Sequence, residues 1–300
     1  MRSEYFKLLT EAMRKDKKIF FLMADTGYNL VEPLFEEFPD RTLNVGIAEQ
    51  NLIGIAAGLA NMGFKPICYA ISQFLVQRAY EQIRNDLCHH DYPVVLVGTS
   101  AGLDNGALWA THYVVDDIGC LKPLPNIQIY SPSSIESIRH IFTESMKTKH
   151  PTYIRITKSM FSEDKKIENP NRIISENKNS KILVISHGRM IKRLVEISKT
   201  LSNFSIFAID KIKPLDESIK NILQNYSKIV VVEDNFSSGL FNSLCQFVIE
   251  KKMDNNKMYS ICVPEDYGKN TGDTSFLDNK FGLNSTQIST FLQNLEKSRY

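Results

Sequence analysis

Short apolar runs alternate along the chain with longer segments in which apolar side chains recur every three to four positions. The runs have the length of strands, and the recurring pattern is typical of helices that cover a sheet. The predicted strands are 18–25, 42–45, 66–71, 93–98, 127–130, 153–156, 181–186, 205–209, 228–233 and 259–263. Alternation of this kind predicts an α/β protein whose sheets are mainly parallel.

A polar stretch divides this pattern into two halves. Residues 161–179 are rich in Lys, Glu, Asn and Ser and contain Pro170, which is typical of a linker. We therefore predict two three-layer α/β domains, at 1–162 and 180–300, joined by a linker at 163–179. The predicted helices are 1–15, 48–62, 77–87, 190–201, 239–249 and 285–295.

The segment 44–51 reads Asn-Val-Gly-Ile-Ala-Glu-Gln-Asn and leads into the predicted helix 48–62. Glu49 stands in the first turn of that helix, where free amides and the helix dipole favour a carboxylate. On the pattern alone, an ordinary first-turn acid is the simpler interpretation. Gly54 and Gly58 leave a smooth strip on the helix, which is costly unless another helix packs closely there.

Composition excludes several classes of function. The 36 basic and 34 acidic residues give a formal net charge of +2 and are scattered, so nothing points to nucleic acid. No apolar stretch is long enough to span a bilayer, and the start lacks the core of a signal peptide. The five cysteines show no paired metal spacing, and we expect reduced thiols in a cytoplasmic protein.

Segment 44–51, followed by Ala-Ala-Gly-Leu-Ala at 56–60, closely resembles the pyrimidine-binding domain of transketolases and deoxyxylulose-phosphate synthases. Further blocks keep the family order: Tyr-Ala-Ile-Ser-Gln-Phe at 69–74, Arg-Ala-Tyr-Glu-Gln-Ile-Arg-Asn-Asp at 78–86, Thr-His at 111–112, Leu-Pro-Asn at 124–126 and Tyr-Ser-Pro at 130–132. The second half resembles the transketolase C-terminal domain less specifically, notably at 230–234. The resemblance implies thiamine diphosphate and a divalent metal, usually magnesium, as cofactors.

In this family a glutamate at the position of Glu49 hydrogen-bonds the cofactor's aminopyrimidine and favours its imino tautomer. The cofactor then performs the difficult step while the protein orients it and tunes its protonation. With the surrounding motif, the catalytic interpretation of Glu49 is favoured. The resemblance also implies that Phe74 stacks on the aminopyrimidine and that Arg78 and Tyr80 line its pocket. The alternative for Phe74 is an ordinary core aromatic. The alternative for Arg78 and Tyr80 is pairing with acids such as Glu81.

The resemblance places His112 beside the substrate, in a position suited to proton transfer near neutral pH. A lone histidine before an apolar helix is more often structural, but the matching flanks favour the catalytic role. Asp25, at the end of the first predicted strand, is also assigned to the substrate. Two more residues stand where relatives have other substrate-binding groups: Ser100 replaces a histidine, and Lys158 replaces a phosphate-contacting arginine, keeping a cation but losing its bidentate fork.

The motif that relatives write as Gly-Pro-Thr-His reads Trp109-Ala110-Thr111-His112 here, and Leu108 replaces the aspartate before it. These departures put an ordinary pentose phosphate substrate in doubt. Trp109 is hypothesised to present a flat apolar wall to a deoxy, amino or nucleotide-linked sugar.

The family's metal-binding Gly-Asp-Gly motif has no match, because Gly272-Asp273-Thr274 is the nearest approach and lies in an expected loop. Magnesium needs oxygen ligands in addition to the phosphates, and no metal ligand is assigned to this chain. The resemblance therefore implies the C-terminal subunit of a split, two-chain transketolase, which transfers a two-carbon ketol unit between sugars and is inactive without an N-terminal subunit carrying that motif. Through Gly54 and Gly58 we expect self-association in a heterotetramer.

Several alternatives stay open. The chain could be the beta subunit of a 2-oxoacid dehydrogenase, although relatives there lack the Thr-His block. It could serve a decarboxylating synthase similar to deoxyxylulose-phosphate synthase, a non-catalytic assembly subunit, or a plain α/β binding module.

Overall fold

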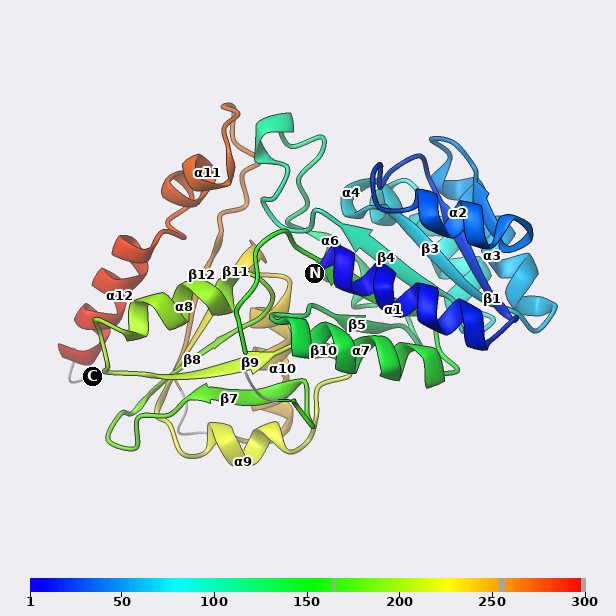
Figure 1. The fold of residues 1–300 in the computed structure, drawn as a ribbon. Helices are drawn as coiled ribbons and strands as arrows, with labels where there is room; N and C mark the ends of the chain where they lie inside the picture. Colours follow the sequence, from blue (N-terminus) through cyan, green and yellow to red (C-terminus); the bar gives the residue numbers. More distant parts are fainter. Residues whose placement is uncertain (164–165, 254–256, 298–300) are drawn as a thin grey trace.

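The computed structural model describes residues 1–163, 166–253 and 257–297, which form two helix-covered sheets (Figure 1). Residues 164–165 of the predicted linker and 298–300 of the predicted second domain lie outside the described residues, as do 254–256. The strands of the first sheet are β1 (Ile19–Met23), β2 (Thr42–Asn44), β3 (Lys65–Ile71), β4 (Val95–Thr99), β5 (Gln128–Tyr130), β6 (Thr152–Ile156) and β10 (Lys211–Lys213). Those of the second sheet are β7 (Asn171–Ser175), β8 (Ile182–Ser186), β9 (Ser205–Ile209), β11 (Lys228–Phe236) and β12 (Lys257–Val263).

The helices follow the strands in the alternating order that the sequence predicts. Those of the first half are α1 (Arg2–Lys15), α2 (Glu32–Glu37), α3 (Glu49–Asn61), α4 (Ser72–Gln77), α5 (Tyr80–Gln82), α6 (Asp117–Leu121) and α7 (Ile135–Lys147). Those of the second half are α8 (Met190–Ser198), α9 (Ile219–Leu223), α10 (Leu240–Glu250), α11 (Thr274–Lys280) and α12 (Ser285–Lys297). A π-helical turn, Ile83–Cys88, continues α5.

The first sheet has the order β10-β5-β6-β4-β3-β1-β2, and only the β10–β5 pair is antiparallel. Successive side chains of a strand point to opposite faces. Accordingly, Leu22 of β1 packs in the core beneath α3, whereas Phe21 and Met23 pack in the core beneath α1 and α7. Helices on both faces make this a three-layer unit and confirm the predicted fold class.

The second sheet has the order β12-β11-β8-β9-β7 and is parallel except for the β7–β9 pair. Its faces are also covered separately: Leu183 and Ile185 of β8 face the side of α9 and α10, and Ile182 and Val184 face α8 and α12. The core on the α10 side is continuous with the core beneath α3. The two sheets are therefore joined by shared apolar packing.

The helices α2, α4, α6, α7, α9 and α11 were not predicted, and three further local features differ from the predictions. Within the predicted linker, residues 171–175 form β7, an edge strand of the second sheet. The short strand β10 leaves the second half of the chain to pair with β5 of the first sheet. The predicted helix 77–87 begins only at Tyr80, with α5, because the chain breaks after α4 ends at Gln77. That break turns the chain at Arg78, next to the candidate site.

Candidate active site

Glu49 is the first residue of α3 and lies at the end of a tight turn that leaves β2. Gly46 has a positive φ of 74°, a conformation that glycine adopts without strain, and Ala48 N–H donates to the Gly46 carbonyl at 2.8 Å. The turn directs Glu49 inward, so that its side chain is only 3% exposed. Its partner is the Arg78 guanidinium, whose Nη1 donates to Glu49 Oε2 at 3.2 Å. The buried carboxylate of Glu49 therefore has a cationic partner.

Arg78, Phe74 and His112 continue from Glu49 as a contiguous row. The Arg78 guanidinium carbon lies 3.8 Å from the centroid of the Phe74 ring, a cation–π contact. The His112 ring also meets Phe74, edge to face, with the centroids 5.0 Å apart. His112 Nδ1 is 2.9 Å from Thr111 Oγ1. Four of the residues selected from the sequence are thus brought together, from α3, α4, the break after α4 and the loop after β4.

This row has the chemistry to hold a flat, nitrogen-rich ring. A buried carboxylate accepts a proton or an N–H bond, and an aromatic face beside it offers stacking. The Arg78 guanidinium, itself planar and rich in N–H donors, uses both groups at once. The aminopyrimidine of the expected cofactor has the same two requirements, so the residues present fit that end of the cofactor.

Tyr80, also assigned to the pyrimidine pocket, is placed differently. It is partly buried and packs against the apolar core beneath α3. Its pocket-lining role stays a prediction.

Asp25 lies at the carboxyl end of β1, next to the turn that leads to Glu49. Its N–H donates to Asn44 Oδ1 at 3.1 Å, and Asn44 Nδ2 donates to Asp25 Oδ1 at 3.0 Å. Asn44 Oδ1 also accepts from Gly46 N–H at 3.0 Å. Sequence reasoning did not assign Asn44 to the site, although an asparagine two residues before a glycine turn is a recognisable turn signal. Asn44 fixes the end of β1 and the turn into α3 together.

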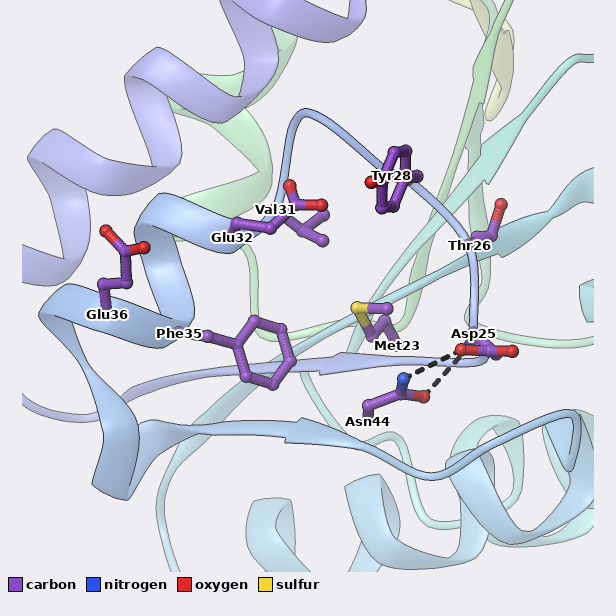
Figure 2. Close-up of a pocket in the computed structure, with 10 residues that line it drawn as sticks. Met23, Asp25, Thr26, Tyr28, Val31, Glu32, Phe35, Glu36 and Asn44 are labelled. Carbon is purple, nitrogen blue, oxygen red and sulfur yellow. Dashed lines mark hydrogen bonds between the residues drawn. The ribbon is translucent and has the colours of Figure 1, made fainter.

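Asp25 and Asn44 border a cavity of about 650 Å³ between the end of β1 and α2 (Figure 2). The cavity is lined by Met23, Asp25, Thr26, Gly27, Tyr28, Val31, Glu32, Phe35, Glu36 and Asn44. Its apolar floor and acidic rim extend the candidate site away from Glu49, and it has room for a small molecule.

The remaining predicted substrate residues border the loop between β4 and α6, residues 100–116, which carries His112 and is called the His112 loop below. Ser100 is buried where β4 ends, with a positive φ of 57°. Trp109 is 46% exposed, and its Nε1 donates to the Gly268 carbonyl at 3.2 Å. Lys158 Nζ donates to the Asp104 carbonyl at 2.9 Å and to Asn105 Oδ1 at 3.2 Å. The ammonium expected to meet a substrate phosphate thus supports the His112 loop.

A buried network of charges links this loop to the second sheet, and sequence reasoning did not find it. Arg155 of β6 is fully buried, and it donates to Asp117 at 2.9 Å and to Asp234 at 3.0 Å. Arg189 continues the network, donating to Asp234 at 2.6 Å and to Asp278. Burial alone would raise the pKa of Asp234, but Arg155 and Arg189 hold it well below its usual range.

Metal ligands and membrane spans can be sought only in the part of the chain that the structure describes. There, no group of three or more His, Cys, Asp or Glu side chains is arranged to hold a metal ion. The near-match Gly272-Asp273 has a local role, because Asp273 caps α11 by accepting from Phe276 N–H at 2.8 Å. Among the described helices, none has the length and apolar character needed to cross a bilayer.

Comparison with known proteins identifies the class of the fold and then the family. The family profile for the transketolase pyrimidine-binding domain matches residues 1–163, and that for the transketolase C-terminal domain matches residues 172–288. The chain is therefore an α/β protein built from these two domains. It belongs to the transketolase family, as the resemblance had implied.

Individual relatives agree with this assignment. The chain is 34% identical over 240 residues to a subunit of an apulose-4-phosphate transketolase of Actinobacillus succinogenes, covering 76% of each chain. It is 32% identical over 305 residues to a 1-deoxy-D-xylulose-5-phosphate synthase of Caldanaerobacter subterraneus, but spans only 48% of that protein. A solved structure described as a split gene transketolase in an inactive β4 tetramer superposes with a TM-score of 0.84 at 27% identity, over 98% of this chain and 96% of that one.

Proposed function

We propose that this chain is the C-terminal subunit of a split, thiamine-diphosphate-dependent transketolase, which transfers a two-carbon ketol unit between sugars. The observation that carries the proposal is the row formed by Glu49, Arg78, Phe74 and His112. The relative named as a transketolase subunit and the split-gene structure support a two-chain enzyme, because this chain covers most of each.

Bound at this site, thiamine diphosphate supplies a carbon nucleophile and an electron sink for cleaving a carbon–carbon bond. Glu49 holds a proton at the aminopyrimidine ring nitrogen, and Phe74 stacks against that ring. For both contacts to form, the Arg78 guanidinium has to leave, because it lies over the Phe74 ring and is hydrogen-bonded to the Glu49 carboxylate. His112, whose ring meets Phe74 edge to face, is proposed to exchange a proton with substrate oxygens.

The second chain of the proposed enzyme carries the Gly-Asp-Gly motif and grips the diphosphate through magnesium. A division into two domains after residue 162, with β7 in the second domain, belongs to the same proposal. Location in the cytoplasm and self-association through α3 in a heterotetramer belong to it as well. The structure described as an inactive β4 tetramer supports the expectation that this chain associates with itself and is inactive alone.

The proposal is tested by reconstituting the chain with the product of a gene encoding a diphosphate-binding subunit. Ketol transfer is measured by mass spectrometry with a panel of ketose donors that includes xylulose 5-phosphate and apulose 4-phosphate, the second because a relative is named for it. Glu49→Gln is expected to lower turnover at least about 100-fold, the usual size of a lost proton-transfer group. Glu11→Gln, an exposed acid on α1, is the matched control.

Unchanged turnover in the Glu49→Gln complex would remove the catalytic assignment. Robust turnover of xylulose 5-phosphate would count against the idea that the departures at Ser100 and Leu108 exclude ordinary pentose phosphates. The relatives that are deoxyxylulose-phosphate synthases favour one second candidate, a decarboxylating synthase. Release of carbon dioxide from pyruvate by the reconstituted pair distinguishes that reaction from ketol transfer.

A further inference from the structure

The His112 loop leaves the first sheet and is packed against the second half of the chain. Gly102 lies so close to Asp234 that a Cβ on it would stand 1.9 Å from Asp234 Oδ2. Near the other end of the loop, Phe236 N–H donates to the Val115 carbonyl at 2.6 Å. The second half of the chain therefore determines the course of a loop that belongs, by sequence, to the first half.

One segment of the second half, residues 264–272 between β12 and α11, makes three polar contacts with this loop. Trp109 Nε1 donates to the Gly268 carbonyl at 3.2 Å. The Tyr113 hydroxyl donates to the Tyr267 carbonyl. In return, the Tyr267 hydroxyl donates to Asp116 Oδ2 at 3.0 Å. In Figure 1 the segment runs as an orange hairpin beside the teal loop near α11.

These contacts lie on both sides of His112 in the sequence. His112 N–H and Tyr113 N–H both donate to the Trp109 carbonyl, at 2.9 and 3.2 Å, so residues 109–113 form one turn. Holding Trp109 and Tyr113 therefore fixes the backbone from which the His112 ring reaches Phe74. Tyr113 is buried, so its ring is held by packing as well as by its hydroxyl bond to the Tyr267 carbonyl.

The sequence of the segment supports the same role. Gly268 has a positive φ of 68°, and its N–H donates to Asp266 Oδ1 at 2.8 Å, which closes a tight turn. The turn presents the Tyr267 and Gly268 carbonyls side by side to the loop. The Tyr267 ring also lies against Phe236, with centroids 5.6 Å apart, which anchors the segment to β11.

We propose that residues 264–272 act as a clasp, with Tyr267 as a positioning residue that sets the place of His112 over Phe74. The C-terminal half then contributes to the reaction geometry without touching the cofactor or the reacting atoms. This inference rests on the proposed function for the role of His112, but the clasp itself is a structural claim that can be measured in the isolated chain.

The first experiment uses Trp109, the only tryptophan of the chain, as its own reporter. Tyr113→Phe/Tyr267→Phe removes two hydroxyl bonds of the clasp and keeps both rings. Quenching of Trp109 fluorescence by acrylamide is expected to rise about twofold in the double variant. The matched control is Tyr130→Phe, which removes a hydroxyl bond of 3.1 Å to Gln128 Oε1 far from the loop. Circular dichroism verifies that each variant is folded.

The second experiment measures the reconstituted pair. Because small misplacements of a reacting group can cost up to about 100-fold, the double variant is expected to lose at least about tenfold in kcat. Its Kd for thiamine diphosphate should stay unchanged, since Glu49 and Phe74 are untouched. Tyr130→Phe should keep wild-type kcat. Asp116→Asn, which keeps an acceptor for the Tyr267 hydroxyl, should retain most of the activity.

Two results overturn the proposal: quenching that does not change in the double variant, or a loosened Trp109 with full kcat. A wild-type pair with no ketol transfer from any donor would overturn the proposed function and the role of the clasp in it. The quenching experiment would then still decide whether residues 264–272 hold the loop.

Discussion

At the scale of single residues, the candidate site depends on a side chain that makes two contacts at once. Arg78 serves Glu49 by hydrogen bonding and Phe74 by stacking, so neither group is left exposed and unpartnered. A buried carboxylate without a partner would be costly. The guanidinium therefore keeps the site ordered before a ligand enters, and its exposed position lets it leave.

These residues could be predicted from the sequence because each belongs to a short, contiguous motif. Glu49 stands behind Gly46 at a helix start, and Phe74 and Arg78 share one segment. The interpretation of Lys158 as a substrate-binding cation stays a prediction; its ammonium contacts Asp104 and Asn105, which lie more than 50 residues earlier in the chain. A pattern of residue types gives no information about such distant partners.

Asp104 provides a prediction that depends on pH. Burial raises the pKa of its carboxyl to about 6, and the Lys158 N–H that it accepts only partly offsets this. An unfolded aspartate titrates near about 4. Because the folded-state pKa is the higher one, folding favours the protonated form, and stability should fall as the pH rises from about 4 to about 6.

Asp104→Asn removes this titration and keeps an acceptor for Lys158 N–H. We expect the variant to be more stable than wild type above pH 6, by an amount on the order of 2 kcal/mol, and to show little difference near pH 4. Urea unfolding at a series of pH values measures this. A difference that is constant across the series would show that Asp104 is not the titrating group.

At the scale of elements, α3 has one face that packs against the first sheet and one that is exposed. Leu52, Ile53 and Ala56 are buried against the first sheet. Gly54 and Gly58 lie on the exposed face, and a Cβ at either position would meet nothing within 4 Å. Nothing in the described part of this chain requires glycine there, so the smooth strip is explained best by an approaching second helix, as the proposed self-association supposes.

Gly58→Leu tests this use of α3. In the single chain the side chain has room, and replacing a helical glycine should raise the stability of the fold by roughly 0.5–1 kcal/mol. In the proposed assembly it would block the close approach and shift the chain toward monomer, as measured by sedimentation velocity. Lys192→Leu, at an exposed position on α8, controls for added apolar surface. An assembly that is equally stable in both variants would exclude this face as the contact.

Two of the strands that sequence reasoning missed share a physical cause. β7 and β10 are short edge strands with polar residues, and they are strands because a neighbour offers them backbone hydrogen bonds. The predicted helix 77–87 likewise starts late, because the chain breaks between α4 and α5 although the local pattern stays helical. Tertiary contacts decided these cases, whereas the buried strands such as β4 and β8 were predictable from their own apolar runs.

At the scale of the whole molecule, the two halves are held by both apolar and charged contacts. The core beneath α3 extends to the helices α9 and α10 of the second half. Beside it, Arg155 joins Asp117 to Asp234, residues 38 and 79 positions away from it in sequence. These separations explain why the network could not be predicted from sequence. They also mean that residues of both halves hold the His112 loop in place.

Arg155→Met tests whether this buried network joins the two halves of the chain. The substitution keeps apolar volume but leaves two buried carboxylates without their shared cation, which typically costs about 3–5 kcal/mol. Because the pKa of Asp234 is held low in the folded protein, its stabilising contribution is present above the usual carboxyl range near about 4 and is lost as the pH falls through the lowered folded-state value. The cost of the variant should therefore be largest at neutral pH and smaller in strong acid.

Urea unfolding measures the loss of stability in the variant. Circular dichroism and Trp109 fluorescence together show whether that loss affects the whole chain or the His112 loop alone. Since Arg155 connects the His112 loop to β11, the two signals should move to lower urea together, and they should still coincide if the halves unfold as one unit. Arg14→Met, which breaks only the exposed pair with Glu37, is the control and should leave the midpoint nearly unchanged. A Trp109 transition that separates from the helical signal in wild type would mean that the His112 loop can unfold alone, and the joint construction of the site would then be contradicted.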